Sequence, residues 1–382
     1  MKTAVFFLQF ALLAFVSCAQ ERPVVITNVD VFDGEQVREN VDFMFGNGKI
    51  LAIGKNADAP QNATVIDGKG LTILPPLINA HVHVARPENL KEALSVGIFA
   101  LLDMFTVDRR ANYLRIFNDS INYAHYYSSN VGATVPNGHG TQYGVTIPTI
   151  NDTVSPAQFV KDRIKLGADY IKIAQEHTMA RLTEDQLNEL ISETHKQNKI
   201  AVAHVSELND AIELAAQNVD GFAHIWYRSP SVASDEDLNM MKAKGIFIVS
   251  TLSVIQKVIE NTEEADKKEL LTLSQVQQEV QKAHQKGIPI LAGTDARNYG
   301  MNYTTQLFDE FILLSQSGLS NIDVLKSGTT NIYQAFQLKE FERLTENAPA
   351  SFVLIEGKPH LNLADIYNKK RVWKNGLEVA AS

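Results

Sequence analysis

Short segments in which hydrophobic and polar residues alternate follow the first twenty residues of the chain. The texts VVITNVDVFDG, VDFMFGNGKILAIG and TVIDGKGLTILP have a period of two, and turn residues accompany them at Asp33-Gly34, Gly46-Asn47-Gly48 and Asp67-Gly68. The same pattern returns after Thr345 in SFVLIEG and RVWKNGLEV. We predict a small antiparallel β domain from residues 22–75, which residues 345–382 rejoin.

Short apolar runs at regular spacing mark the central residues 76–344. The runs are LINAHVHV, GIFALLDM, SNVGATV, DYIKIA, IAVAHV, DGFAHIW, GIFIVST and IPILAGTDA. Between most of them, apolar residues recur with the spacing of an amphipathic helix, at residues 183–198, 207–218, 235–244 and 274–286. Because parallel strands need a crossover connection, usually a helix, this alternation predicts an α/β fold, a (β/α)8 TIM barrel.

The first residues, MKTAVFFLQFALLAFVSCAQ, have the pattern of a secretory signal peptide. Lys2 supplies a basic start, and residues 4–16 are apolar apart from Gln9. This run is shorter than the about 20 residues that a membrane-spanning helix needs, and polar residues follow it at once. We therefore expect residues 1–19 to be a signal peptide and the protein to be extracytoplasmic.

Two processing routes remain open for this signal. Ser17-Cys18-Ala19 fits a site cut after Ala19, which would release a soluble protein into the bacterial periplasm. Phe15-Val16-Ser17-Cys18 resembles a bacterial lipobox, with Phe15 where Leu is usual, and Cys18 would then become the lipidated first residue. The second route predicts a lipoprotein that contacts the membrane through a lipid anchor at Cys18.

Charge and cysteine content narrow the partners. The 44 acidic residues outnumber the 35 basic ones, for a net charge of −9, so the electrostatic footprint of a nucleic-acid-binding protein is missing. With one cysteine the chain forms no internal disulfide and no thiolate zinc site, so a metal would need nitrogen and oxygen ligands. We expect a small-molecule substrate and leave a homo-oligomer open.

Histidines gather at the ends of the predicted strands. His81 and His83 are two residues apart, so a strand turns both imidazoles to one face. His204 and His224 end two later strands, and Asp295 ends the last one. The carboxyl ends of barrel strands form the active-site face, where these side chains would converge. Four imidazoles and a carboxylate suit Zn²⁺ or a similar divalent ion.

Lys172 lies in the middle of DYIKIA, a run that we expect to be a buried strand. A buried ammonium is costly unless it is paired or chemically altered. Two interpretations stay open. Lys172 pairs with an acid at the barrel mouth, or its amine carries CO₂ as a carbamate whose two oxygens are able to bridge two metal ions.

The order of these residues resembles the metal-dependent amidohydrolase superfamily. That pattern has HxH on the first barrel strand, lysine on the fourth, histidines on the fifth and sixth and aspartate on the eighth, matched here by His81, His83, Lys172, His204, His224 and Asp295. The resemblance covers nearly the whole mature chain. The sequence around the matched residues is similar to the prolidase, carboxypeptidase and imidazolonepropionase-related branch. It implies a β-sandwich domain that the two terminal segments form beside the barrel.

The resemblance also implies a cofactor and a reaction. His81, His83 and Asp295 would hold one Zn²⁺, His204 and His224 would hold another, and carboxylated Lys172 would bridge them. A hydroxide that bridges the ions would hydrolyse the amide or peptide C–N bond of a dipeptide, an N-acyl amino acid or a cyclic amide. In this mechanism Asp295 acts as the base and then as the acid.

Departures from the family pattern indicate a divergent member with its own substrate. Pro75-Pro76 replaces the usual Pro-Gly, and Asn79 stands where an aspartate usually precedes HxH. Asn331-Ile332-Tyr333 replaces Asn-Pro-Ala, and residues 346–352 replace a Gly-rich return. None of these changes removes a metal ligand.

Two loops contain candidate substrate-binding residues. His139 and Tyr143 lie in the glycine-rich text ATVPNGHGTQYGVTIPT, which is either a substrate loop or simply a tight loop. Tyr227 and Arg228 follow His224, and the guanidinium fork of Arg228 would suit a substrate carboxylate.

Two rival functions stay open. A mononuclear deaminase of a small heterocycle fits the HxxE spacing of His204 and Glu207, although such enzymes generally lack the lysine on the fourth strand. A non-catalytic extracytoplasmic binding lipoprotein would have a decayed site, whereas the ligand positions here are intact.

Overall fold

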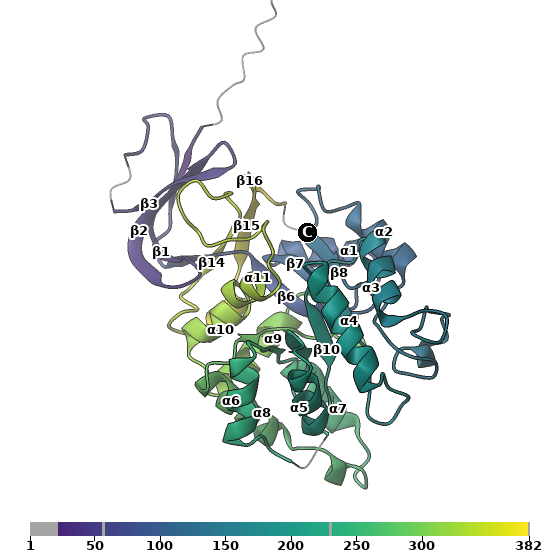
Figure 1. The fold of residues 1–382 in the computed structure, drawn as a ribbon. Coiled ribbons are helices and arrows are strands. Elements are labelled where there is room, and N and C mark those ends of the chain that lie inside the picture. The colour runs from purple at the N-terminus through teal and green to yellow at the C-terminus, as the bar shows by residue number, and fades with distance from the viewer. Residues whose placement is uncertain (1–21, 56–57, 229–230, 381–382) are drawn as a thin grey trace, which may run out of the picture.

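Strands from both terminal segments share one sheet in the computed structural model, which describes residues 22–55, 58–228 and 231–380 (Figure 1). The predicted signal peptide with Cys18 lies outside the described residues. The sheet has eight strands, β1 (Val24–Phe32), β2 (Val37–Gly46), β3 (Lys49–Gly54), β4 (Thr64–Asp67), β5 (Leu71–Leu74), β14 (Phe352–Glu356), β15 (Lys370–Lys374) and β16 (Leu377–Glu378). Their order is β16-β15-β14-β5-β1-β2-β3, with β4 also paired to β1.

The prediction of a purely antiparallel unit is wrong for two of these strands. β1 pairs with β2 in antiparallel fashion, but both β4 and β5 run parallel to β1. A tight hairpin forces antiparallel pairing, as between β2 and β3, whereas the chain crosses from β3 back to β1 through a longer connection that leaves the direction free. The sheet is therefore mixed.

An aromatic cluster joins the two terminal segments of the sheet. Phe352 packs edge-on against Phe43 and Phe45, with ring centroids 4.9 and 5.1 Å apart, and stacks on Trp373 at 5.0 Å. All four rings are buried. The residues predicted to rejoin the N-terminal domain thus contribute to its core, and the two-layer sandwich form and the exact domain limits stay predictions.

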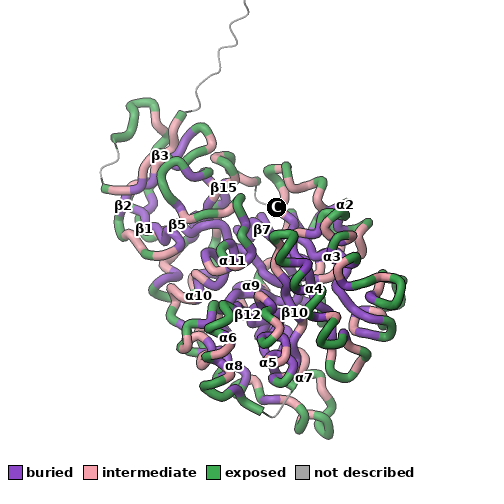
Figure 2. The backbone as a smooth tube through the Cα atoms, in the orientation of Figure 1, coloured by how far each residue is buried: buried purple, intermediate pink, exposed green. Residues whose placement is uncertain are grey.

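The central residues form a TIM-barrel-type domain with two arcs of parallel strands. One arc is β6 (Leu77–Val82), β7 (Ile98–Asp103) and β8 (His125–Ser128), and the other is β9 (Ile171–Ile173), β10 (Ala201–His204), β11 (Gly221–Ala223), β12 (Phe247–Val249) and β13 (Ile290–Leu291). Single parallel bridges connect the arcs, between Ala133 and Ile173 and between Val82 and Ala296. Buried residues run through the centre of this domain and of the terminal sheet (Figure 2).

Helices follow most of the central strands, and none in the described residues is long and apolar enough to cross a membrane. They are α1 (Pro87–Ser95), α2 (Asp108–Arg115), α3 (Pro156–Lys165), α4 (Glu184–Lys196), α5 (Leu208–Ala216), α6 (Asp235–Ala243), α7 (Leu252–Asn261), α8 (Leu273–Gln285), α9 (Gln306–Gln316), α10 (Asn321–Ser327) and α11 (Thr330–Ala335). The four predicted helices are confirmed as α4, α5, α6 and α8. Capping boxes at Thr183, Ser234 and Thr272 explain the starts of α4, α6 and α8.

The third central strand begins earlier than its apolar pattern predicted. We expected it at SNVGATV, residues 129–135, but β8 ends at Ser128. Asn130 has φ +58°, a left-handed conformation that breaks an extended strand. Beyond this break the chain meets β9 again at Ala133, whose backbone N–H donates to the carbonyl of Lys172 at 2.7 Å.

Asp33 connects the end of β1 to the chain beyond α11. Its buried carboxylate accepts hydrogen bonds from the backbone N–H groups of Glu35 and Gln36, at 2.9 and 3.1 Å, and from Arg343 at 2.9 Å. Burial raises the pKa of this carboxyl group, but these donors outweigh burial and hold the pKa below its ordinary value of 3.8. The ionised form therefore stabilises the fold.

We expect Asp33→Asn to lower the free energy of unfolding by about 1–3 kcal/mol near neutral pH, because buried donors lose a charged acceptor. The folded-state pKa lies below the unfolded one, so this stabilisation is present above about pH 4 and is lost as the pH falls through the folded-state pKa. Urea unfolding at neutral pH and near pH 3 measures it, with the exposed Asp58→Asn as control. An equal deficit at both pH values would contradict the role of ionised Asp33.

Candidate metal centre

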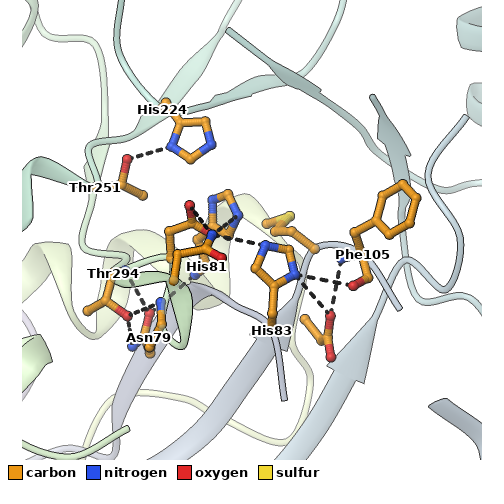
Figure 3. Close-up of polar contacts among 12 residues, drawn as sticks. Asn79, His81, His83, Phe105, His224, Thr251 and Thr294 are labelled. Carbon is orange, nitrogen blue, oxygen red and sulfur yellow. Dashed lines mark hydrogen bonds and ion pairs between the residues drawn. The ribbon is translucent and has the colours of Figure 1, made fainter. Parts of the chain in front are cut away.

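The side chains of His81, His83 and His224 lie close together at the strand ends (Figure 3), beside Asp295, which follows β13. His81, on β6, places Nε2 3.2 Å from Asp295 Oδ1. His83 lies two residues later, just after the end of β6, and places its own Nε2 2.9 Å from the same oxygen. The two-residue spacing of the histidines thus puts both rings on one side of the strand end, beside one carboxylate.

The remaining strand-end histidines lie next to this group. Ligand-type atoms of His81, His224 and Asp295 all lie within 4.8 Å of one another, and all three residues are buried. The ring of His224 is 4.7 Å from that of His81 and 4.8 Å from that of His204, measured between centroids. The structure therefore brings together His204 and the other four predicted residues, with a nitrogen and oxygen donor set that suits a divalent ion.

Unusual backbone conformations aim these side chains. His224 has φ +80° and Asp295 has φ +58°, in the left-handed region that residues other than glycine rarely adopt. Gly293 lets the chain after β13 approach β6, because a Cβ there would lie 2.9 Å from the Cβ of His81. The backbone N–H of Asp295 then donates to the carbonyl of His81 at 2.8 Å. Such strain at strand ends is typical of functional sites.

Lys172 is buried on β9 without a hydrogen-bond partner for Nζ among the described residues. Burial lowers the pKa of this amine to about 7, and the opposing charge of Asp295 does not offset the effect. Near neutral pH a large fraction of the amine is therefore uncharged. The prediction that Lys172 simply pairs with an acid gains no support, since no ion pair of its Nζ is found in the part of the chain described.

Burial divides the histidines into two electrostatic classes. It lowers the pKa of His81 to about 4 and that of His224 well below its ordinary value, so both rings are neutral near pH 7. His83 is also subject to burial, but its bonds to Asp103 and Asp295 outweigh it and raise the pKa to about 10 in the metal-free protein. Asp295 stays ionised, because His81 and His83 lower its pKa against the effect of burial.

The Nδ1 atoms of two of these rings contact partners that the sequence analysis did not identify. Thr251 Oγ1 lies 2.7 Å from Nδ1 of His224, and the carbonyl of Phe105 lies 3.2 Å from Nδ1 of His83 (Figure 3). Asp103, at the end of β7, accepts a hydrogen bond from the backbone N–H of Phe105 at 3.1 Å and so helps to fix the backbone at Phe105. The position of Asp103 at the end of an apolar run was a usable signal.

Glu176 is a second acidic residue missed in the sequence. Its Oε2 accepts from Nε2 of His204 at 3.1 Å, and its Oε1 accepts from the hydroxyl of Ser206 at 2.7 Å. Burial raises the pKa of Glu176, but these bonds and the His204 charge outweigh it and lower the pKa to about 2. The signal in the sequence was an even spacing. Glu176 follows Lys172 by four residues, which puts both side chains on the same side of an extended chain.

Asn79 has a structural role that suits an amide better than the aspartate that the family pattern usually has at this position. Its Nδ2 donates to Thr294 Oγ1 at 2.9 Å, while its Oδ1 accepts from the backbone N–H groups of Thr294 and His81 at 3.2 and 3.3 Å. One side chain thus fastens β6 to the segment that contains Asp295. Because it offers both a donor and an acceptor, Asn79 does this without adding a buried charge.

The predicted substrate-binding residues lie beside His204. His139 stacks on its ring, with centroids 4.7 Å apart and planes 23° from parallel, and Tyr143 contacts His139 with centroids at 6.1 Å. Burial, followed by the charge of His204, lowers the pKa of His139 to about 3. Tyr143 is 62% exposed, so it lies at the rim of the site. Their binding role stays a prediction.

Tyr227 and Arg228 belong to the loop between β11 and α6. Both backbone N–H groups donate to the carbonyl of Ser206, each at 2.9 Å, which fixes this loop above β10. Tyr227 is buried, whereas Arg228 is exposed with its guanidinium 5.7 Å from the centre of the Tyr227 ring. Arg228 is thus an exposed cation, opposite in charge to a carboxylate.

Comparison with known proteins places this arrangement in a family. Residues 72–379 match the amidohydrolase family. The ochratoxinase of Aspergillus niger is 24% identical over 436 aligned positions, which cover 94% of this chain and 89% of that protein. A deacetylase of Brucella anthropi is 39% identical over 72 positions, 18% of each chain.

Solved structures show the same fold at low sequence identity. A Xaa-Pro dipeptidase with bound methionine in its active site superposes with a TM-score of 0.79 at 18% identity, covering 93% of this chain and 99% of the other. The A. niger ochratoxinase structure gives 0.78 at 19% identity and covers 94% and 95% of the two chains. These similarities support the TIM-barrel-type domain.

Proposed function

The chain belongs to the amidohydrolase family and is a hydrolase of carbon–nitrogen bonds, and from this premise we propose that it is an exported, metal-dependent enzyme that cleaves a small amide or peptide. The substrate class is a dipeptide, an N-acyl amino acid or a cyclic amide. The convergence of His81, His224 and Asp295 at the strand ends is the observation that carries this proposal. The ochratoxinase and dipeptidase names of similar proteins point to the same bond type.

We propose that the side chains hold a pair of divalent ions and that these ions are Zn²⁺. Two neutral imidazoles and an ionised carboxylate face one another, and the buried amine of Lys172 has no hydrogen-bond partner among the described residues. An uncharged amine is the form that reacts with CO₂, so the lowered pKa of Lys172 favours a carbamate bridge. When bound, the ions would acidify water and polarise the substrate carbonyl.

The chain's own residues supply proton transfer and orientation. Asp295 accepts a proton as the water attacks the carbonyl carbon and delivers it to the leaving nitrogen, acting as base and then as acid. Arg228 at the rim binds a substrate carboxylate, and Tyr227 packs beneath it. His139, stacked on His204, and Tyr143 beside it supply further substrate contacts.

The dinuclear proposal is favoured over a mononuclear deaminase. Glu207, the acid of the HxxE spacing, is the N-cap residue before α5 and places its carboxylate 3.8 Å from Nδ1 of His177 on the neighbouring loop. Lys172, by contrast, is buried without a partner among the described residues, which suits a metal-bridging group. The same intact donor set argues against a binding protein with a decayed site.

Lys172→Ala tests the bridge. We expect the variant to lose most of its bound metal and its hydrolysis of dipeptides and N-acyl amino acids, because the anionic bridge is removed. Added acetate or propionate should restore part of both, since a short carboxylate fits the vacated space. Metal analysis and turnover assays with and without the added acid measure this. Full metal content in Lys172→Ala would exclude Lys172 as a bridge.

Asp295→Asn tests proton transfer. The amide keeps an oxygen ligand but cannot accept the proton, so turnover should fall by about 10²–10⁴-fold while much of the metal is retained. KM should change little, because the lost interaction belongs to the chemical step. Steady-state kinetics together with metal analysis separate the two effects. Near-normal turnover with two ions bound would move proton transfer to another group, such as His139.

Cys18 tests the route of export. If Cys18 is lipidated, Cys18→Ala should move the protein from the membrane fraction to the soluble extracytoplasmic fraction, because a covalent acyl chain supplies the membrane affinity. If processing occurs after Ala19, both proteins should be soluble. Cell fractionation with mass measurement of the mature N-terminus distinguishes them, and cytoplasmic retention with residues 1–19 intact would contradict export.

A further inference from the structure

One ring nitrogen of His204, Nε2, contacts a carboxylate. Nε2 donates to Oε2 of Glu176 at 3.1 Å, while the ring stacks on His139 and meets the edge of His224. An ionised carboxylate only accepts hydrogen bonds. In the neutral form of His204, the single ring proton must therefore reside on Nε2. Nδ1 then keeps the lone pair that a metal ion requires.

Glu176 is itself fixed in place by the protein. Its Oε1 accepts from the hydroxyl of Ser206 at 2.7 Å and from the backbone N–H of His177 at 3.1 Å. Ser206 is buried, and its carbonyl accepts the N–H groups of the loop after β11. The carboxylate therefore holds the ring of His204 from a support that spans the ends of β9, β10 and β11.

The support of His204 differs in kind from that of His224. The partner of His224 Nδ1 is the hydroxyl of Thr251, which is able to donate or accept and so leaves the ring proton free to occupy either nitrogen. A carboxylate leaves no such choice. The contact with Glu176 therefore carries information about protonation that the contact with Thr251 does not.

We propose that Glu176 is a positioning residue that keeps the proton of His204 on Nε2 and turns Nδ1 toward the metal centre. This inference rests on the proposed function for the role of the metal centre, whereas the hydrogen bond between Glu176 and His204 does not depend on that function. Carboxylates that accept from a metal-ligating histidine orient the ring and raise its basicity, and their loss typically weakens metal binding by about 10–100-fold.

A direct role in substrate binding is the main rival for Glu176, since a carboxylate could bind the amino group of a dipeptide. Both of its oxygens are already engaged by His204, Ser206 and the His177 backbone. The side chain is also only 12% exposed. The geometry thus assigns Glu176 to the support of His204, and the experiment separates the two roles.

The first measurement uses the metal-free full-length protein labelled with nitrogen-15 histidine. The ring nitrogen shifts report which nitrogen of His204 carries the proton, and the loss of signals in His204→Gln assigns them. We expect the Nε2-protonated form in the wild type and in Glu176→Gln, whose amide oxygen still accepts. In Glu176→Ala we expect a mixture of both tautomers.

The second measurement is zinc affinity by competition with a chromophoric chelator. We expect Glu176→Ala to weaken binding by about 10–100-fold and Glu176→Gln by less, because the amide keeps the bond but not the charge. Glu213→Gln is the matched control, since Glu213 binds Arg181 at 2.9 Å on the neighbouring helix α5. Circular dichroism and thermal unfolding verify that each variant folds.

The outcomes separate this inference from the proposed function. If the ring shifts of His204 and the zinc affinity of Glu176→Ala equal those of the wild type, the positioning role is overturned. A change confined to KM for substrates with a free amino group would also overturn it. If the ring shifts of His204 depend on Glu176 but the wild type hydrolyses no amide, the positioning of the ring stands and the proposed function fails.

Discussion

Shared burial of ionisable side chains at one end of the central strands is the constraint on which the candidate site depends. Desolvation disfavours charge, so it keeps His81 and His224 neutral and lowers the pKa of Lys172 to about 7, which leaves a substantial fraction of its amine uncharged near neutral pH. One carboxylate, Asp295, stays ionised because two imidazoles face it. Burial thus prepares lone pairs, an uncharged amine and one anion in the same place, which is the condition for holding a cation.

The fold meets this constraint by bringing separate chain segments into close contact. Gly293 permits the approach of the last strand to β6, and Asn79 fastens the two through both a donor and an acceptor. His224 and Asp295 adopt left-handed backbone conformations that a free chain would avoid. The packed barrel-type core provides the stability that retains this strain, so the site and the scaffold are physically linked.

Repetitive features of the fold were predictable from the sequence, whereas local breaks were not. Helices α4, α5, α6 and α8 follow from periodicity, and capping residues mark the starts of α4, α6 and α8, because both signals are local. The position of β8 was wrong because Asn130 interrupts an apolar run with a left-handed turn. The parallel direction of β4 and β5 depends on a connection across the sheet, which alternation of residues does not encode.

The same distinction applies to the site. Ligand-type residues lie at strand ends in a recognisable order, so His81, His224 and Asp295 could be expected to meet. Their supports could not, because Thr251 and Phe105 act through a hydroxyl and a backbone carbonyl that carry no pattern in the sequence.

These supports make the histidines chemically unequal. A hydroxyl beside His224 stabilises either tautomer, whereas the carboxylate of Glu176 beside His204 stabilises one and adds negative charge. Hydrogen bonding to an anion also makes the opposite ring nitrogen a stronger electron-pair donor to a metal ion. The pair that the family resemblance assigns to one ion is therefore asymmetric, and this asymmetry arises from Glu176 and Ser206, outside the shared ligand pattern.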